Sequence, residues 1–200
     1  PFINEIIEIA KSTQLRELNK SDGKNTNRIS KKDCPKLKDA EFAGKKKGPC
    51  YLILTEGDSA MTTALSGLTV IGGKRYGILP LRGKPLNVLD ASVNQLQKNE
   101  EFKSIKKALG LEQGKTYTSL DQLRYSAILL FADADLDGSH IKGLIINMIQ
   151  TFWPSLIELG FISCIITPVI KITVGKTVYE FTSDIAFEQW KSQNPDTKIS

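Results

Sequence analysis

The sequence predicts an α/β fold in which a parallel sheet is flanked by helices. Apolar runs of strand length alternate with segments of helical periodicity, which is typical of parallel strands joined by crossover helices. Two of these runs end in short acidic signatures, at Glu56 to Ala60 and at Asp133 to Gly138. Because parallel strands point the same way, both signatures are expected at one edge of the sheet.

The expected strands are short and are bounded by turn residues. They cover Tyr51 to Thr55, Tyr76 to Pro80, Ala127 to Phe131 and Ile162 to Val174, the last with a change of character at Pro168. A turn at Gly175 and Lys176 then leads into a return strand that ends at Phe181. The sequence therefore adds a hairpin extension to the parallel sheet.

The expected helices lie between and after these strands. They cover Phe2 to Leu18, Ser59 to Ser66, Ser92 to Lys98, Glu101 to Leu109 and Asp184 to Lys191. A further helix follows the second acidic signature, with Ser139 as its N-cap. Its apolar stripe includes Met148 and Phe152, which we interpret as core residues packed against the sheet and not as a cofactor site.

A change of composition divides the chain near residue 48. Residues 19–48 are polar and lysine-rich, which favours a linker with a solvated face over a dedicated nucleic-acid site, although Leu37, Ala40 and Phe42 offer local docking contacts. We therefore predict an N-terminal helix and linker over residues 1–48 and the α/β domain over residues 49–200. The chain starts at Pro1 and stops in a polar stretch, so we expect a piece of a longer protein with a domain incomplete at its C-terminus.

Composition narrows the classes of partner. The chain has 200 residues and a formal net charge of +5, and its pI is near 9.0. This balance favours a polyanionic partner around a locally acidic pocket. The three cysteines lack the number and spacing of a disulfide framework or a zinc site, which fits a reducing intracellular compartment. No apolar run has the length of a membrane span, so no membrane partner is expected.

The acidic signatures predict a site for a divalent cation. Glu56 from the first and Asp133, Asp135 and Asp137 from the second are expected to meet at the carboxyl edge of the sheet. Two carboxylates about 4 Å apart repel by about 4 kcal/mol at an effective dielectric constant of about 20, so such a cluster needs a compensating charge. Magnesium prefers carboxylate and phosphate oxygens. The alternative is that these residues only form turns and cap the following helices.

A basic loop follows the second expected strand and is predicted to face a phosphate. Arg82 and Lys84 flank a glycine there, and Asn87 adds a neutral hydrogen-bonding group. His140, the only histidine, lies at the start of the helix after the second acidic signature. The alternative is a basic surface turn without a ligand.

Three blocks of this sequence resemble the hallmark blocks of the Toprim domain in type IIA DNA topoisomerases. They are Glu56 to Ala60, Pro80 to Val88, and Asp133 to Ile141. The resemblance extends over roughly residues 28 to 190 and is closest to the eukaryotic-type enzymes. Ala134 and Leu136 depart from it, because Gln and His are usual there and these two residues are closer to gyrase.

The resemblance implies a Rossmann-like Toprim fold and a set of roles. Glu56, Asp133 and Asp135 would be catalytic and would hold Mg²⁺, for which Mn²⁺ can substitute, with Asp137 supporting the cluster. Arg82, Lys84, Asn87 and His140 would contact double-stranded DNA near the cleaved phosphate. In the full-length enzyme, which is a homodimer, the nucleophilic tyrosine and the ATP site would lie elsewhere, so this fragment would bind no ATP and would be inactive alone.

Two other functional classes fit the acidic signatures. A primase or nuclease with a related Toprim domain explains the carboxylates but not the block from Pro80 to Val88. A nonenzymatic reading makes the chain a magnesium-dependent DNA-binding module. For the topoisomerase, the resemblance implies a nuclear location if the source is a cellular eukaryote and an intracellular location otherwise.

Overall fold

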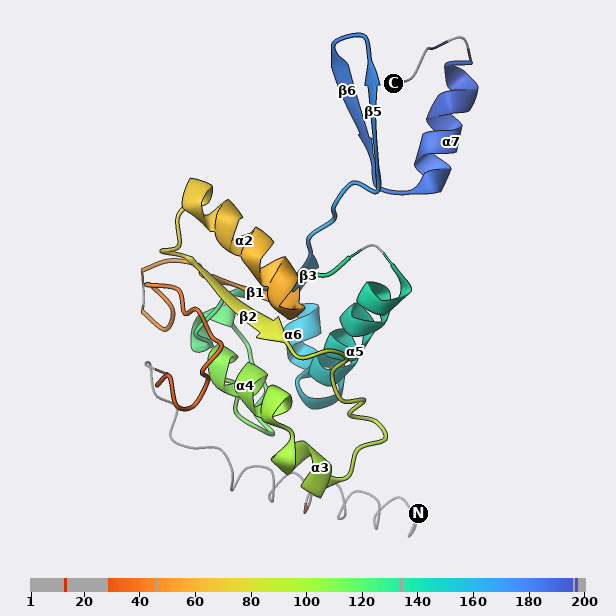
Figure 1. The fold of residues 1–200 in the computed structure, drawn as a ribbon. Coiled ribbons are helices and arrows are strands. Elements are labelled where there is room, and N and C mark those ends of the chain that lie inside the picture. Colours follow the sequence, from red (N-terminus) through yellow and green to blue (C-terminus); the bar gives the residue numbers. More distant parts are fainter. Residues whose placement is uncertain (1–12, 14–28, 46, 134, 196, 198–200) are drawn as a thin grey trace.

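The fold is built on four parallel strands in the order β2-β1-β3-β4 (Figure 1). The computed structural model describes residues 13, 29–45, 47–133, 135–195 and 197. The strands of this sheet are β1 (Tyr51–Glu56), β2 (Tyr76–Leu81), β3 (Ala127–Phe131) and β4 (Ile162–Cys164). The helices are α2 (Gly57–Ile71), α3 (Val93–Lys98), α4 (Glu100–Leu109), α5 (Leu136–Phe152), α6 (Pro154–Glu158) and α7 (Asp184–Gln193).

The order of the strands places the helices on both faces of the sheet. The chain moves from β1 to β2 in one direction and from β3 to β4 in the other. Because crossovers between parallel strands are right-handed, α2 covers one face, and α4, α5 and α6 cover the opposite face (Figure 1). This is the three-layer α/β arrangement that the sequence predicts.

The main hydrophobic core lies between the sheet and the second of these faces. Alternate strand residues such as Leu52, Leu54 and Ile128 point into it and are almost fully buried. Ile145 and Met148 of α5 join the same cluster, which confirms the apolar stripe predicted for this helix. Each fully buried aliphatic side chain of this kind stabilises the fold by about 1.5–3 kcal/mol.

Helix α5 starts earlier than the sequence analysis predicts. Its N-cap is Asp135, whose Oδ1 accepts a hydrogen bond from the Gly138 N–H at 2.7 Å. The prediction of Ser139 as N-cap is therefore wrong. Aspartate caps a helix as well as serine does, and Asp135 comes first along the chain, so the second acidic signature itself forms the first turn.

The strand predicted from Ile162 to Val174 is in fact two strands in different sheets. Strand β4 ends at Cys164, and β5 (Ile170–Val174) pairs with β6 (Thr177–Phe181) in an antiparallel hairpin. Pro168 lies in the connection. Proline has no N–H to donate, so a continuous ladder through this position is not available.

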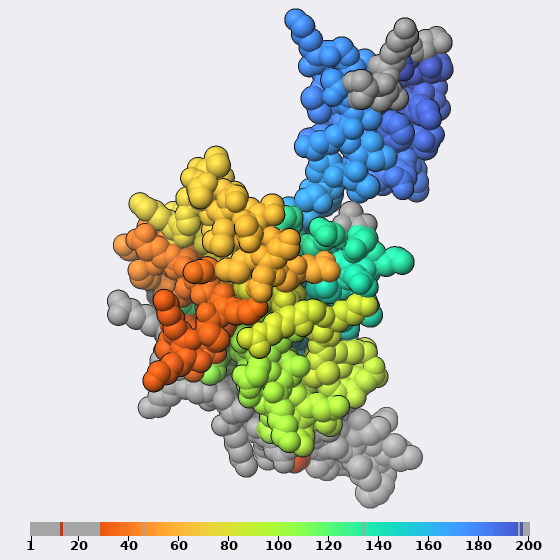
Figure 2. All heavy atoms as spheres, viewed as in Figure 1, coloured from red at the N-terminus to blue at the C-terminus, as the bar shows by residue number. Residues whose placement is uncertain are grey.

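The hairpin and α7 form a small unit with its own aromatic contacts. The rings of Phe181 and Trp190 lie 5.8 Å apart, and those of Phe181 and Phe187 lie 5.4 Å apart. In Figure 2 this unit stands away from the rest of the molecule on a narrow connection. It therefore matches the hairpin extension that the sequence predicts.

Residues 30–45 lie against the sheet. Lys38 and Ile78 exchange two backbone hydrogen bonds, of 2.9 and 2.8 Å, so this segment adds a short bridge to β2. Cys34, Ala40 and Ala43 are buried in the core. The local docking that the sequence allows is thus present, while the boundary at residue 48 stays a prediction. The predicted helix from Phe2 to Leu18 lies, apart from Thr13, outside the described residues.

A polar triad of Asp39 with the buried Arg124 and Tyr125 fastens this segment to the domain. Asp39 accepts hydrogen bonds from the Arg124 guanidinium and the Tyr125 hydroxyl, both at 2.5 Å, and the Tyr125 oxygen accepts one from the Ala40 N–H at 3.0 Å. Burial and the neighbouring Asp39 carboxylate raise the pKa of Tyr125 well above its usual value. The hydroxyl therefore stays protonated and remains a donor to Asp39.

Replacing the tyrosine of this triad tests its contribution to stability. Tyr125→Phe removes the donor to Asp39 and the acceptor for Ala40, so we expect the free energy of unfolding to fall by about 1–3 kcal/mol in urea titrations. Tyr179→Phe is the matched control, because its hydroxyl makes no hydrogen bond within the described part of the chain, and it should change stability by less than about 0.5 kcal/mol. Equal effects of the two substitutions would contradict this role of the triad.

Candidate metal centre

The two acidic signatures lie at neighbouring strand ends. In the ladder between β1 and β3, Thr55 is opposite Phe131, so Glu56 and Asp133 both lie just beyond the paired region. Helix α2 leaves β1 on one face of the sheet and α5 leaves β3 on the other (Figure 1). The ends of β1 and β3 therefore form a topological switch point, the position at which open α/β sheets bind ligands, and we refer to this position as the crevice.

Glu56 is half-buried and its carboxylate is only partly satisfied. It occupies the N-cap position of α2 without using its side chain as a cap. Within the described residues, its buried Oε2 has no hydrogen-bond partner. Burying an unpaired polar oxygen is costly, and a carboxylate costs more than a neutral group. A cation bound at this oxygen would remove that cost.

The backbone around Glu56 is held in a sharp turn. Thr55 is fully buried, and its Oγ1 donates a hydrogen bond to the Gly57 carbonyl at 3.1 Å. Gly57 has φ of +76°, which disfavours residues with a Cβ atom. This turn carries the chain from β1 directly into α2 and keeps Glu56 at the crevice.

Asp133 is positioned by close packing against α5. A Cβ atom at Gly138 would lie 2.2 Å from the Asp133 carbonyl oxygen and 3.0 Å from the Asp133 nitrogen. Lys142, one turn further along α5, donates a hydrogen bond from Nζ to the same carbonyl at 3.4 Å. The backbone of Asp133 thus lies directly on the first turn of α5, while its side chain is exposed.

The other two aspartates of the signature have partners within the protein. Asp135 caps α5, as described above. The Asp137 carboxylate lies 2.8 Å from Lys84 Nζ, and the hydrogen bond and charge of Lys84 lower the pKa of Asp137. Because solvent screens an exposed ion pair, this pair links the basic loop to α5 without strong stabilisation.

The candidate carboxylates do not meet at one point. Among the residues that the structure describes, no three His, Cys, Asp or Glu side chains lie close enough together to enclose a metal ion. The structure thus brings together the backbone positions of Glu56, Asp133, Asp135 and Asp137. Their roles as metal ligands stay predictions.

The donor set is suited to magnesium. All four candidate groups offer hard carboxylate oxygens, and the Glu56 Oε2 atom has no hydrogen-bond partner among the described residues, so it is free to accept a cation. Two long helices, α2 and α5, also direct their N-termini to this edge. Their dipoles favour negative charge there, each by about 0.3–1 kcal/mol, which helps carboxylates and a phosphate to share the crevice.

The basic loop after β2 borders the same edge, since Leu81 pairs with Glu56. Arg82 is exposed, and its backbone N–H donates to the Glu101 carboxylate. Gly83 has φ of +79°, which makes the turn between Arg82 and Lys84. Lys84 therefore reaches across to α5 on a turn that favours glycine.

Asn87 and His140 differ in their availability. The Asn87 side chain is already engaged, because Oδ1 accepts from Asn147 at 3.2 Å and Nδ2 donates to Asp90 at 2.5 Å. His140 is exposed on the first turn of α5. His140 is thus accessible to a ligand, whereas Asn87 would have to exchange partners.

One basic side chain at this edge was not predicted from the sequence. Lys36 Nζ contacts both carboxylate oxygens of Asp58, at 3.0 and 3.1 Å, in the first turn of α2. Only the docking of residues 30–45 on β2 brings Lys36 here. The sole signal in the sequence is that Lys36 lies within the roughly 28 to 190 range over which the chain resembles the topoisomerases.

Gly138 provides a test of the positioning of Asp133. Gly138→Ala would force the Asp133 backbone away, so we expect metal affinity to fall by about tenfold or more. Gly143→Ala, in the same helix with open space at its Cβ position, should leave metal binding unchanged and raise the free energy of unfolding by about 0.5–1 kcal/mol. Manganese binding followed by water-proton relaxation measures both. Unaltered binding by Gly138→Ala would show that this contact does not position Asp133.

The ion pair between Lys84 and Asp137 predicts a change in pH dependence. Lys84→Met should raise the pKa of Asp137 toward its usual value, because the hydrogen bond and positive charge that lower it are removed. Lys84 thus stabilises the fold at neutral pH, and this contribution is lost as the pH falls through the lowered pKa. Carboxylate ¹³C NMR titration reports the value directly.

Lys103→Met is the matched control for this titration. Lys103 lowers the pKa of Glu100 in the same way, so that substitution should raise the pKa of Glu100 and leave Asp137 unchanged. An Asp137 pKa that did not respond to Lys84→Met would contradict the pairing.

Comparisons with known proteins agree with this geometry. The family model for the Toprim domain matches residues 51–165. DNA topoisomerase 2 of Acanthamoeba polyphaga mimivirus is 51% identical over 98% of this chain, and DNA topoisomerase 2 of Saccharomyces cerevisiae is 44% identical over 94% of it. The chain spans only 16% and 13% of the length of these two relatives.

A solved structure shows the same fold. The DNA-binding, cleavage and re-ligation domain of Plasmodium falciparum topoisomerase II superposes with a TM-score of 0.80 at 45% identity, covering 87% of this chain and 24% of that one. None of the helices in the described part of the chain is long and apolar enough to cross a membrane. The chain therefore belongs to the Toprim family, in the form found in the DNA topoisomerase 2 proteins.

Proposed function

We propose that this chain supplies the magnesium-binding part of the DNA cleavage and religation centre of an ATP-dependent type II DNA topoisomerase, which passes one duplex through a transient break in another. One observation carries this proposal. Glu56, whose buried Oε2 has no hydrogen-bond partner within the described residues, lies at the end of β1, next to the end of β3 after which the Asp133 signature begins. A bound cation at this position would satisfy the unpaired carboxylate oxygen.

Glu56, Asp133 and Asp135 would hold the metal, and Asp137 would support the cluster. Bound there, magnesium supplies a Lewis acid for the scissile phosphate and the departing 3′-oxygen. Glu56 would exchange a proton with that oxygen. Asp135 has one carboxylate oxygen in the cap of α5, so its coordination would use the other oxygen or loosen the helix start.

The basic loop would hold the DNA backbone across the crevice. Arg82 and Lys84 both extend from the turn at Gly83, and His140 lies beside Asp137 on α5. Contacts to phosphate fix the position of the duplex without reading its sequence. Because Lys84 already pairs with Asp137, an arriving phosphate would compete with that carboxylate and leave it available to the metal.

The remaining parts of the reaction would be supplied by other regions of the enzyme. The nucleophilic tyrosine, the ATP site and the homodimer contacts would belong to the full-length protein. The two relatives named above are six or more times longer than this chain. We infer a nuclear location if the source is a cellular eukaryote. A primase or nuclease based on a Toprim domain would share the carboxylates but would not attach covalently to a DNA 5′ end.

Substitution of the crevice carboxylates tests the proposed function. In the full-length enzyme, Glu56→Ala or Asp133→Ala should lower magnesium-dependent DNA cleavage by about 10²-fold or more, because each removes charge that stabilises the transition state. Folding should be retained, since neither variant loses a favourable contact in the metal-free fold. Glu158→Ala, an exposed position on α6, is the control. Cleavage at the wild-type rate by either crevice variant would overturn the assignment.

A further inference from the structure

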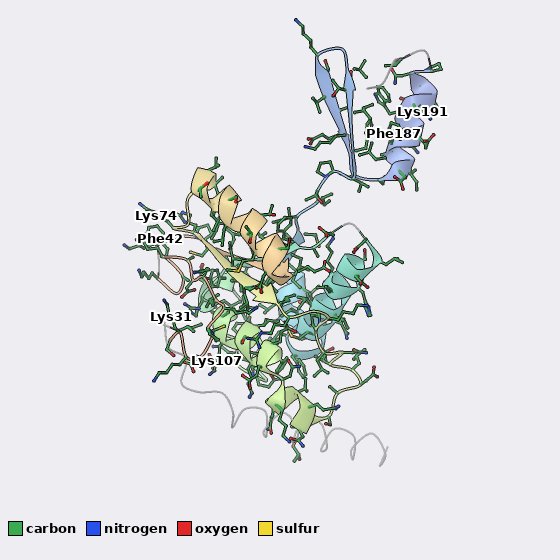
Figure 3. All side chains as sticks on the ribbon, in the orientation of Figure 1. Lys31, Phe42, Lys74, Lys107, Phe187 and Lys191 are labelled. Atoms are coloured by element: carbon green, nitrogen blue, oxygen red, sulfur yellow. The ribbon has the colours of Figure 1, made fainter. Side chains whose placement is uncertain are left out.

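A second basic surface lies at the opposite edge of the sheet from the metal centre. It consists of Lys45, Lys47, Lys74 and Arg75 around the half-buried ring of Phe42, and we call it the Phe42 surface. Figure 3 shows Phe42 and Lys74 together on the flank that lies away from the tip of the β2 arrow. The proposed function does not use this surface.

Phe42 connects the four cations. Its N–H donates to the Lys74 carbonyl at 2.9 Å, and its own carbonyl accepts from the Lys45 N–H at 2.9 Å. Lys47 Nζ lies 5.2 Å from the centre of the ring, and the Arg75 guanidinium carbon lies 5.8 Å from it. The positive charges are therefore gathered by backbone geometry and ring contacts.

These cations are not neutralised within the described part of the chain. None of the ion pairs there involves Lys45, Lys47, Lys74 or Arg75, and Glu41 is the acidic residue adjacent to Phe42 in sequence. All four side chains are exposed. By contrast, Lys36, Lys84 and Lys107 each have a carboxylate partner. The Phe42 surface thus presents uncompensated positive charge around an aromatic ring.

Structural roles account for only part of this arrangement. Arg75 Nη1 donates to the Pro49 carbonyl at 3.1 Å, which fixes the entry into β1. Lys74 and Arg75 also follow the C-terminus of α2, where the helix dipole favours cations. Neither reason applies to Lys45 and Lys47.

We infer that the Phe42 surface binds the phosphate backbone of duplex DNA, away from the cleavage position. Lysine and arginine side chains without partners bind phosphates and release counterions, and the ring of Phe42 holds two of them in place. The six residues of β1 separate this surface from Glu56 by about 17 Å, so no single phosphate contacts both. The choice of DNA as the polyanion rests on the proposed function.

The test is the salt dependence of duplex binding, measured by fluorescence anisotropy in EDTA with a labelled blunt duplex. The variant Lys45→Gln/Lys47→Gln/Lys74→Gln keeps Arg75 and its structural hydrogen bond. We expect the slope of log K against log salt to become shallower by about 2.7, or about 0.9 for each lost phosphate contact. Circular dichroism verifies that the variant is folded.

The matched control removes the same charge from dispersed positions. Lys98→Gln/Lys176→Gln/Lys191→Gln takes three exposed lysines from other elements, and Lys191 lies 5.9 Å from the ring of Phe187 much as Lys47 lies over Phe42. This variant should change the slope by less than about 1, within the reach of a single contact. Equal slopes for the two triple variants, or an unchanged slope for the first, would overturn the inference.

Two further measurements separate this inference from the proposed function. Loss of binding to polyglutamate without loss of duplex binding would assign the surface to an acidic protein segment and overturn the DNA assignment. Manganese binding is measured on the same preparations, because the metal centre does not involve Phe42 or its neighbours. If the first triple variant lost duplex binding while the wild-type chain bound no manganese, the proposed function would be refuted and the DNA-binding role of the Phe42 surface supported.

Discussion

The parallel pairing of β1 with both β2 and β3 is the constraint on which the site depends. It brings Glu56, the Arg82–Lys84 turn and the Asp133 signature to one edge, although 76 residues lie between Glu56 and Asp133 in the sequence.

 The same pairing sends α2 and α5 to opposite faces, so their N-termini converge on the crevice. Without this pairing the two acidic signatures would lie on unrelated surfaces, because they are far apart in the sequence and only the sheet brings them together.

The electrostatics of the crevice are only partly balanced by the protein. Lys36 pairs with Asp58 and Lys84 pairs with Asp137, but both pairs are exposed, so solvent screening keeps their contributions small. Helix dipoles add about 0.3–1 kcal/mol each. Neither Glu56 nor Asp133 forms an ion pair among the described residues, so the negative charge that a cation would neutralise is concentrated at these two side chains.

Much of the fold could be predicted from the sequence because its signals are local. The apolar runs at Tyr51 and Ala127 define strands to within one residue. Predictions failed where two local signals compete, as at Asp135 and Ser139, or where one proline divides an apolar run, as at Pro168. The positions of the site residues at the strand ends could be predicted for the same reason, because each acidic signature directly follows an apolar run.

Contacts between segments that are distant in the sequence could not be predicted from local signals. The triad of Asp39, Arg124 and Tyr125, and the contact of Lys36 with Asp58, join residues that carry no pattern marking them as partners. The close approach of Gly138 to Asp133 also depends on the three-dimensional path of the chain. Glycine in an Asp-Gly pair predicts a turn equally well, so the sequence alone does not reveal this packing.

The most direct test of the central claim asks whether Glu56 and Asp133 act on one ion. We would titrate manganese into the wild-type chain, Glu56→Gln, Asp133→Asn and the double variant by electron paramagnetic resonance, with magnesium as competitor. A shared site predicts one magnesium-displaceable ion in the wild type, weakened binding of that same ion in each single variant, and coupled effects of the two substitutions in the double variant. Two displaceable ions in the wild type with one lost in each single variant, or unchanged binding in either single variant, would contradict a common metal centre.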